Sequence, residues 1–265
     1  MIRYVLLGVI QGLTEFLPVS SSGHLALAQR FLSFDPPGVV LEAVLHLGTL
    51  AAILVVFRRD WIGLVISLGP HGDRATRTMW IRLVIASVPI AVCGYFVRSQ
   101  VETAFESPVI VGLGFLVTSA FLLGAAHTSA RANRDAVSPV RALLIGIAQA
   151  AALVPGISRS GATVATGVLT GVRGREAARF SFLLAIPALL GAGGFCVLET
   201  LRSPEPQSAA WGALLVATLT ATAVGVLAVR WFLRAISRER LRVFAAYCAL
   251  LGLVTLIHTA IVGSG

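Results

Sequence analysis

A short polar stretch near the start of the chain carries side chains that could do chemistry. Glu15 follows Gln11 by four residues, so both side chains project from one face of a helix. Three serines at positions 20–22 and then His24 follow closely. A carboxylate within an apolar segment is costly and usually functional. This stretch therefore offers a general acid or base and, among its hydroxyls, a nucleophile.

A second polar stretch contains an arginine where an apolar helix is expected to break. Arg159 lies between Ser158 and Ser160, after a Pro-Gly pair and shortly before Gly161 and Thr163. A guanidinium binds phosphate or carboxylate oxygens in a bidentate way, and free N–H groups at a helix start also hold phosphate. Two interpretations remain open: a salt bridge to the carboxylate of the first stretch, or a substrate phosphate held between the two.

Each of these residues also has a simpler structural interpretation. Serines at the start of a helix commonly cap it. His24 taken alone is typical of a packed histidine, and Glu15 could merely pair with an arginine. The combination of carboxylate, hydroxyls, imidazole and guanidinium at two helix breaks favours one phosphate site built from both stretches.

The two stretches look like copies of one element. Each begins as an apolar helix, breaks at a proline, crosses a Ser/Gly-rich turn and becomes apolar again. A shift of 138 residues superposes Gly8 on Gly146, Gln11 on Gln149, Ser20 on Ser158, Ser22 on Ser160 and Gly23 on Gly161. The chemistry differs between the copies, because the first has the carboxylate and imidazole and the second has the arginine.

The composition predicts a polytopic membrane protein. Hydrophobic residues make up 57% and charged residues only 12%, whereas soluble domains carry about a quarter charged residues. The formal net charge is +9, but all 21 Lys and Arg residues are arginines, mostly in short connections beside apolar runs. That placement is typical of topology signals rather than of nucleic-acid binding. The three cysteines lie in apolar runs, which argues against a disulfide framework or a metal cluster.

The apolar runs divide into short and full-length segments, since a span needs about 20 residues. Full-length spans are predicted at Val39–Phe57, Met79–Val97, Val109–Ala126, Ala177–Leu198, Trp211–Val229 and Val243–Val262. Two re-entrant hairpins are predicted from the short pairs Ile2–Leu17 with Leu25–Leu32 and Ala142–Val154 with Gly161–Val172. We thus expect an all-α protein of one membrane domain, residues 1–265, with repeats at about 1–127 and 139–265.

A signal peptide is the rival interpretation of the first run. Arg3 gives it a basic start, and the segment 26–28 resembles a cleavage site. Against this, Glu15 interrupts the apolar region, and the same pattern recurs in mid-chain, where no signal peptide can lie.

The distribution of arginines predicts how the repeats enter the membrane. Because each half has three spans, an odd number, the second half must enter the membrane upside down. Arginine-rich connections alternate with arginine-poor ones along the chain, as this topology requires. The arginine-rich connections are 58–77, 131–141, 173–179 and 230–242. Both termini and the first hairpin are thereby expected on the outer side, and the second hairpin on the inner side. Inverted repeats with broken helices are an architecture of many transporters.

The stretches Gln11–His24 and Pro155–Thr163 closely resemble the paired signatures of the bacterial undecaprenyl-pyrophosphate phosphatase family linked to bacitracin resistance. That family pairs an (E/Q)xxxE segment and a Pro-x-Ser-Ser-x-Gly-His turn with a PGxSRSxxT segment. Both occur here in the same order. The resemblance implies a multi-pass hydrolase of the bacterial inner membrane that removes the terminal phosphate of undecaprenyl diphosphate and so recycles the lipid carrier for peptidoglycan synthesis.

The resemblance also implies roles for particular residues. Glu15 matches a metal-binding or basic carboxylate, Ser21 a nucleophile, His24 a proton-transfer residue and Arg159 a phosphate clamp. A divalent metal, Mg or Ca, is expected on Glu15 and Gln11, although Gln11 fills a position that is Glu in some members. The expected phosphate-binding residues are Ser20, Ser22, Ser158, Ser160, Gly161 and Thr163.

Partners follow from the same interpretation. We expect a polyprenyl diphosphate lipid and the bilayer, no nucleic acid, and we leave a homodimer open. A lipid-phosphate flippase with the same inverted-repeat fold is the alternative function, and a purely structural membrane protein would leave Glu15 and Arg159 unexplained.

Overall fold

The computed structural model describes residues 1–31, 38–69, 73–202 and 211–262. Within these ranges the chain forms α-helices and one 3-10 turn, with no β-strand, so the all-α prediction is confirmed. The helices are α1 (Ile2–Thr14), α2 (Ser21–Phe31), α3 (Gly38–Val56), α4 (Arg58–Ile66), α5 (Arg74–Phe96), α6 (Arg98–Glu106), α7 (Pro108–Thr128), α8 (Pro139–Ala151), α9 (Arg159–Leu169), α10 (Gly174–Arg202), α11 (Trp211–Ala235) and α12 (Arg238–Val262).

Four of these helices are long and apolar enough to cross a membrane by themselves. They contain the segments Thr76–Phe96, Pro108–Arg131, Trp211–Ala235 and Arg238–Ile261. A bilayer core of about 30 Å needs about 20 helical residues, which each of these supplies. The chain is therefore a multi-pass membrane protein. Of the other two predicted spans, Val39–Phe57 matches α3 but extends one residue beyond its end, and Ala177–Leu198 lies within α10.

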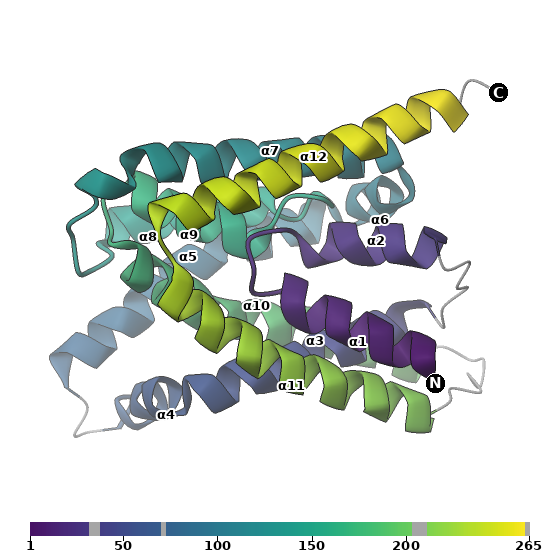
Figure 1. Cartoon of the computed structure of the whole chain (residues 1–265). Coiled ribbons are helices and arrows are strands. Elements are labelled where there is room, and N and C mark those ends of the chain that lie inside the picture. Colours follow the sequence, from purple (N-terminus) through teal and green to yellow (C-terminus); the bar gives the residue numbers. More distant parts are fainter. Residues whose placement is uncertain (32–37, 70–72, 203–210, 263–265) are drawn as a thin grey trace.

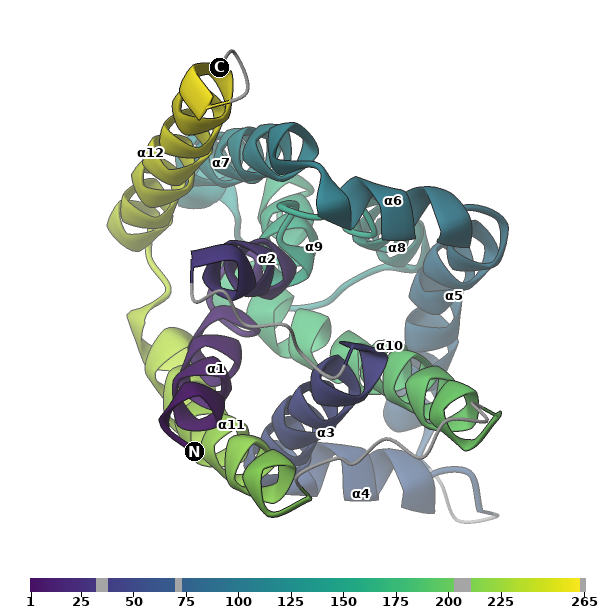
Figure 2. The same cartoon turned by 90° about the vertical axis from the view of Figure 1, so that its right-hand side faces the viewer.

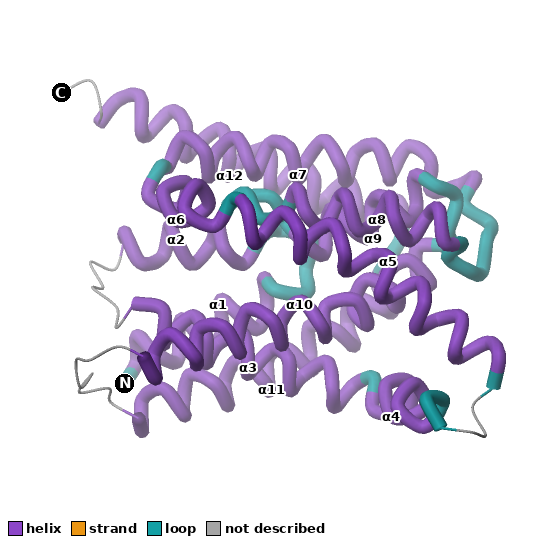
Figure 3. The backbone as a smooth tube through the Cα atoms, turned by 180° about the vertical axis from the view of Figure 1, so that it is seen from behind, coloured by secondary structure: helices purple, strands orange, loops and turns teal. Residues whose placement is uncertain are grey.

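The short apolar runs form two pairs of short helices, as predicted. α1 and α2 extend inward from one end of the molecule, and α8 and α9 extend inward from the other (Figure 1). Each pair is interrupted midway along the molecule rather than at its surface (Figure 3). The helices after the breaks begin earlier than predicted: α2 starts at Ser21 and α9 at Arg159, because the serine before each accepts a backbone N–H and caps it.

Two segments that the sequence analysis treated as connections are helices instead. α4 follows α3 directly and is fixed by indole hydrogen bonds, with Trp61 Nε1 donating to Leu54 O over 2.9 Å and Trp80 Nε1 donating to Leu64 O over 2.6 Å. α6 lies just before Ser107, whose side chain caps α7. Both are nine residues long and carry charged side chains, so a search for long apolar runs does not detect them.

The short helices lie inside a ring of longer ones. Viewed from the end that holds both termini, α2 and α9 are surrounded by α3, α5, α7, α10, α11 and α12 (Figure 2). α1 packs on α11, while α8 packs on α5. Glycines permit both contacts, since a Cβ at Gly8 would lie 2.6 Å from Ala217 O and one at Gly146 would lie 2.4 Å from Ala86 O. The fold thus holds both helix breaks at its centre.

Candidate active site

Glu15 and Arg159 join the two polar stretches at the centre of the molecule. Arg159 Nη2 donates to Glu15 Oε1 over 2.6 Å. The Glu15 side chain is only 6% exposed and the Arg159 side chain 14%, so the ion pair is largely shielded from its surroundings. Of the two interpretations that the sequence left open, this structure contains the direct salt bridge. An incoming phosphate must therefore share Arg159 with Glu15 or replace it.

The second oxygen of Glu15 is held by the first stretch itself. Ser21 Oγ donates to Glu15 Oε2 over 2.6 Å, and Gln11 Nε2 donates to the same oxygen over 3.2 Å. His46 of α3 also acts electrostatically on this carboxylate. The arrangement places a hydroxyl in direct contact with a base, which is the geometry that activates a nucleophile.

Two buried polar atoms beside this carboxylate have no hydrogen-bond partner among the described residues. One is Arg159 Nη1, a donor, and the other is Gln11 Oε1, an acceptor. Leaving such atoms unpaired costs about 1–3 kcal/mol each, and more for a charged group. Nη1 suits a phosphate oxygen, and an amide oxygen suits a cation or a hydrogen-bond donor.

The turn after Glu15 is fixed by Ser20. Its φ of 68° lies in the left-handed region that residues with a side chain rarely adopt. The Ser20 carbonyl accepts from His24 Nδ1 at 2.7 Å, and its hydroxyl accepts from Gly23 N at 3.3 Å. Ser20 is buried, whereas Ser21 and Ser22 are half-buried. Capping is thus performed by Ser20, which leaves the hydroxyl of Ser21 for Glu15.

The second turn repeats this capping pattern. Ser158 Oγ accepts from Gly161 N at 3.0 Å and lies 3.2 Å from Ser160 Oγ. Ser160 Oγ donates in turn to Leu17 O over 3.0 Å, which connects the second turn to the break of the first hairpin, between α1 and α2. Both serines are about 1% exposed. The Ser158 hydroxyl therefore caps α9, while the Ser160 hydroxyl joins the two turns.

Thr163 and the start of α9 are held by polar contacts from neighbouring helices. Thr163 Oγ1 is fully buried and lies 2.6 Å from Ser181 Oγ on α10. Thr118 Oγ1 on α7 donates to Gly156 O over 3.0 Å and accepts from Ser158 N at 2.8 Å. The predicted phosphate-binding hydroxyls are therefore all close to the break, but those of the second stretch are internal.

His24 lies on the α12 side of the first turn. Its Nε2 is 2.6 Å from Tyr247 Oη, and its ring is nearly parallel to that of Tyr247 and nearly perpendicular to that of Phe115. The predicted site residues did not include Tyr247, Thr118, Ser181 or His46. Of these four, only His46 could have been suspected from the sequence, because it is a histidine within the apolar run of α3. The other three are far from the two polar stretches in sequence and are common residues in membrane helices.

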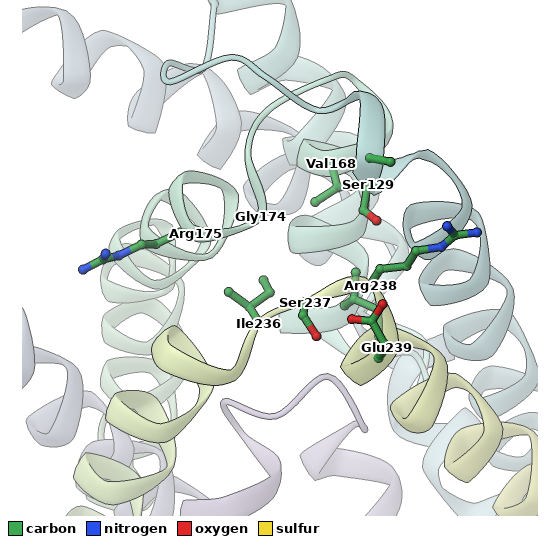
Figure 4. A pocket seen from close by; sticks show the side chains of 10 residues that line it. Ser129, Val168, Gly174, Arg175, Ile236, Ser237, Arg238 and Glu239 are labelled. Carbon is green, nitrogen blue, oxygen red and sulfur yellow. The ribbon is translucent and has the colours of Figure 1, made fainter.

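A separate cavity of about 370 Å³ lies at the end of the molecule where the α11–α12 connection approaches the start of α10 (Figure 4). Its lining includes Ser129, Arg175, Ser237 and Glu239, and none of the predicted site residues. It is not part of the Glu15–Arg159 site.

The family model of the bacitracin resistance protein BacA matches residues 4–254. The chain belongs to the BacA family. Relatives named undecaprenyl-diphosphatase come from Desulforapulum autotrophicum, 39% identical over 96% of both chains, and from Rubrobacter xylanophilus, 41% identical over 93% of this chain and 94% of the other. A third, from Korarchaeum cryptofilum, is 40% identical over 95% of this chain and 97% of the relative.

The donor set of this BacA family member can be tested against the expected divalent metal. Across the described ranges, no three His, Cys, Asp or Glu side chains gather as a metal cluster. Glu15 and the unpaired Gln11 Oε1 nevertheless supply adjacent oxygen donors. Mg²⁺ is usually bound through one or two carboxylates together with substrate phosphates. The residues therefore fit a cation held jointly with a substrate, and not one enclosed by protein alone.

Proposed function

We propose that this protein hydrolyses undecaprenyl diphosphate to undecaprenyl phosphate and inorganic phosphate. The observation that carries the proposal is the buried Glu15–Arg159 pair, which joins two helix breaks and leaves one guanidinium nitrogen unpaired. Breaking a diphosphate requires mainly positioning and neutralisation of charge on the phosphate oxygens. The relatives named undecaprenyl-diphosphatase support the lipid substrate.

Arg159 and Glu15 have complementary roles in this proposal. Arg159 binds the terminal phosphate through Nη1 and shares Nη2 with Glu15. The Glu15 carboxylate accepts the proton of the nucleophile. That nucleophile is either Ser21 Oγ, which already donates to Glu15 over 2.6 Å, or a water that takes the place of this bond. In either case the bond between the terminal phosphorus and the bridging oxygen is broken, and the lipid leaves as its monophosphate. A water that attacks directly releases inorganic phosphate in the same step, whereas attack by Ser21 forms a phosphoserine that a water must then hydrolyse to release inorganic phosphate and restore the hydroxyl.

The remaining hydroxyls position the turns around the phosphate. Ser22 is half-buried and is the hydroxyl proposed to contact substrate. The buried side chains keep the backbone N–H groups at the starts of α2 and α9 in place, where such groups bind phosphate. They are Ser20, Ser158, Ser160 and Thr163, with Gly161 contributing its backbone.

A divalent cation, Mg²⁺ or Ca²⁺, would be held by Glu15 and Gln11 together with the substrate. When bound, it would supply positive charge to the diphosphate oxygens. The protein residues then orient the phosphate and move the proton. Loss of turnover in the presence of a chelator, restored by added Mg²⁺ or Ca²⁺, is the expected result.

We further propose that the two halves are inverted-topology repeats. The support is that corresponding helices make corresponding contacts: α1 of the first half packs on α11 of the second, and α8 of the second packs on α5 of the first. The termini lie at one end, and the α7–α8, α9–α10 and α11–α12 connections lie at the other (Figure 1). Placing the arginine-rich end inside puts both termini outside, in the bacterial inner membrane.

Cysteine labelling tests this orientation. Arg141 Nε donates to Thr170 O over 3.0 Å, so the two ends of the second hairpin lie together. Single cysteines at 141 and 173 are expected to react only with a reagent supplied from the inner side. Labelling from opposite sides would contradict the re-entrant hairpin.

The decisive test of the function uses purified protein and undecaprenyl diphosphate in detergent, where transport between leaflets has no readout. We expect stoichiometric release of inorganic phosphate and recovery of undecaprenyl phosphate by mass spectrometry. A soluble short-chain analogue separates the chemistry from lipid binding. If no phosphate is released, while the same protein in vesicles moves the intact lipid between leaflets, the protein is a flippase instead.

A further inference from the structure

The side chain of His24 is held by two hydrogen bonds of different kinds. Its Nδ1 lies 2.7 Å from the carbonyl oxygen of Ser20, and its Nε2 lies 2.6 Å from the hydroxyl of Tyr247. The His24 and Tyr247 rings are nearly parallel, with planes 8° apart and centroids 5.7 Å apart. The Phe115 ring is nearly perpendicular to the imidazole, with centroids 5.4 Å apart.

These contacts assign the protons of the neutral imidazole. A backbone carbonyl can only accept, so His24 Nδ1 carries the hydrogen and donates it to Ser20 O. His24 Nε2 then has a lone pair and accepts from the hydroxyl of Tyr247. The tautomer of a histidine at a reactive site is set in this way by the partner of its other nitrogen.

Both nitrogens of His24 are therefore engaged by protein groups. His24 is half-buried, whereas Tyr247 is 44% exposed. The bond also joins residues that are far apart in the sequence, since His24 lies in the first hairpin and Tyr247 on the last helix, α12. If His24 exchanges a proton at Nε2, the Tyr247 hydroxyl fixes the position of that nitrogen beforehand.

We propose that Tyr247 is a positioning residue for His24: its hydroxyl donates to Nε2 and fixes the orientation of an imidazole whose Nδ1 hydrogen is held by Ser20 O. This inference rests on the proposed function, and it gives His24 the proton-transfer role that the family resemblance implies for it. It assigns α12 a part in the active site in addition to its packing on α7.

The Tyr247→Phe variant separates the hydroxyl from the ring. Phenylalanine keeps the aromatic ring beside His24 but cannot donate to Nε2. α12 is held against α7 by other contacts, including the close approach of Gly252 to Gly112 O. Tyr95→Phe is the matched control, because it removes the hydroxyl of an 83% exposed tyrosine on α5 that lies outside the site.

The experiment measures kcat and KM with undecaprenyl diphosphate for Tyr247→Phe, His24→Ala, the double variant and Tyr95→Phe. We expect Tyr247→Phe to lower kcat about 10-fold, below the 10²–10⁴-fold usually supplied by a general acid–base group, with KM within about twofold. In the His24→Ala background, removing the hydroxyl should cause no further loss, since it acts through His24. Tyr95→Phe should match the wild type.

Several outcomes would overturn the inference. Wild-type turnover in Tyr247→Phe or in His24→Ala would do so, as would losses that multiply in the double variant. If Tyr247→Phe does not fold, 3-fluorotyrosine at position 247 keeps the shape and the hydroxyl but strengthens the donor; an unchanged kcat would then overturn it. Absence of phosphate release by the wild type would instead refute the proposed function and is seen before any variant is compared.

Discussion

The two helix breaks share a capping pattern but differ in chemistry. In each, the serine before the second helix caps it, accepting from the N–H three residues later at 3.3 Å in the first break and 3.0 Å in the second. In each, that serine lies 3.2 Å from the serine two residues later. Only the first break has a carboxylate and an imidazole, and only the second has a guanidinium. The same capping pattern thus carries different chemistry in the two breaks.

The paired glutamines make the same comparison at one position. Gln11 and Gln149 are both fully buried. Gln11 donates to Glu15, but Gln149, whose equivalent neighbour is Leu153, has neither amide atom hydrogen-bonded within the described structure. Gln11 thus contacts a charged side chain, whereas Gln149 has an apolar leucine at the equivalent position.

Replacing the carboxylate should remove the activity of the first break. Glu15→Gln keeps the shape but cannot take a proton at neutral pH, so turnover should fall by about 10³-fold or more. Gln11→Ala should only weaken turnover, because Ser21 and Arg159 still hold Glu15. Phosphate release, normalised to folded protein, measures both. An equal loss in the two variants would reverse this ranking.

The second break should depend on the fork of its arginine rather than on charge alone. Arg159→Lys cannot hold both Glu15 and a phosphate oxygen, so kcat should fall by about 10²-fold with the fold retained. Arg173→Lys, at an exposed ion pair with Asp135, is the control and should behave as the wild type. Near-normal turnover in Arg159→Lys would show that a positive charge suffices.

The scaffold itself should respond alike in the two halves. Gly8→Ala and Gly146→Ala both push a Cβ into a facing backbone carbonyl, which should destabilise the protein by about 1–3 kcal/mol each. Gly94→Ala has open space and should cause no loss. Thermal unfolding in detergent compares the three. A large effect in one half only would mean that the equivalent contacts do not bear equal weight.

The unpaired glutamine should be dispensable. Gln149→Met removes a buried amide that has no partner in the described part of the chain, so the protein should become more stable by about 1 kcal/mol with unchanged turnover. Gln11→Met removes a bond to Glu15 and should lower turnover about 10-fold. Loss of activity in Gln149→Met would show that the second glutamine also serves the site.

Much of this organisation follows from sequence patterns, for identifiable reasons. The apolar runs, the shortness of the hairpin helices and the placement of Glu15 and Arg159 at breaks are local features that the sequence displays directly. Residues contributed by other helices are different: Tyr247, Thr118 and Ser181 reach the site only through long-range packing. The sequence also could not show that Ser158 and Ser160 point inward. That direction depends on how the two turns pack, with Ser160 Oγ donating to Leu17 O.

Binding to a hydrolysis-deficient protein tests most directly whether the two breaks form one phosphate site. In detergent, Glu15→Gln should bind intact undecaprenyl diphosphate, and adding Arg159→Ala should weaken that binding by about 10–100-fold, as expected for loss of hydrogen bonds to a charged group. Undecaprenol, which lacks phosphate, should bind both variants equally. Equal affinity of the single and double variants for the diphosphate would contradict a site shared between the two hairpins.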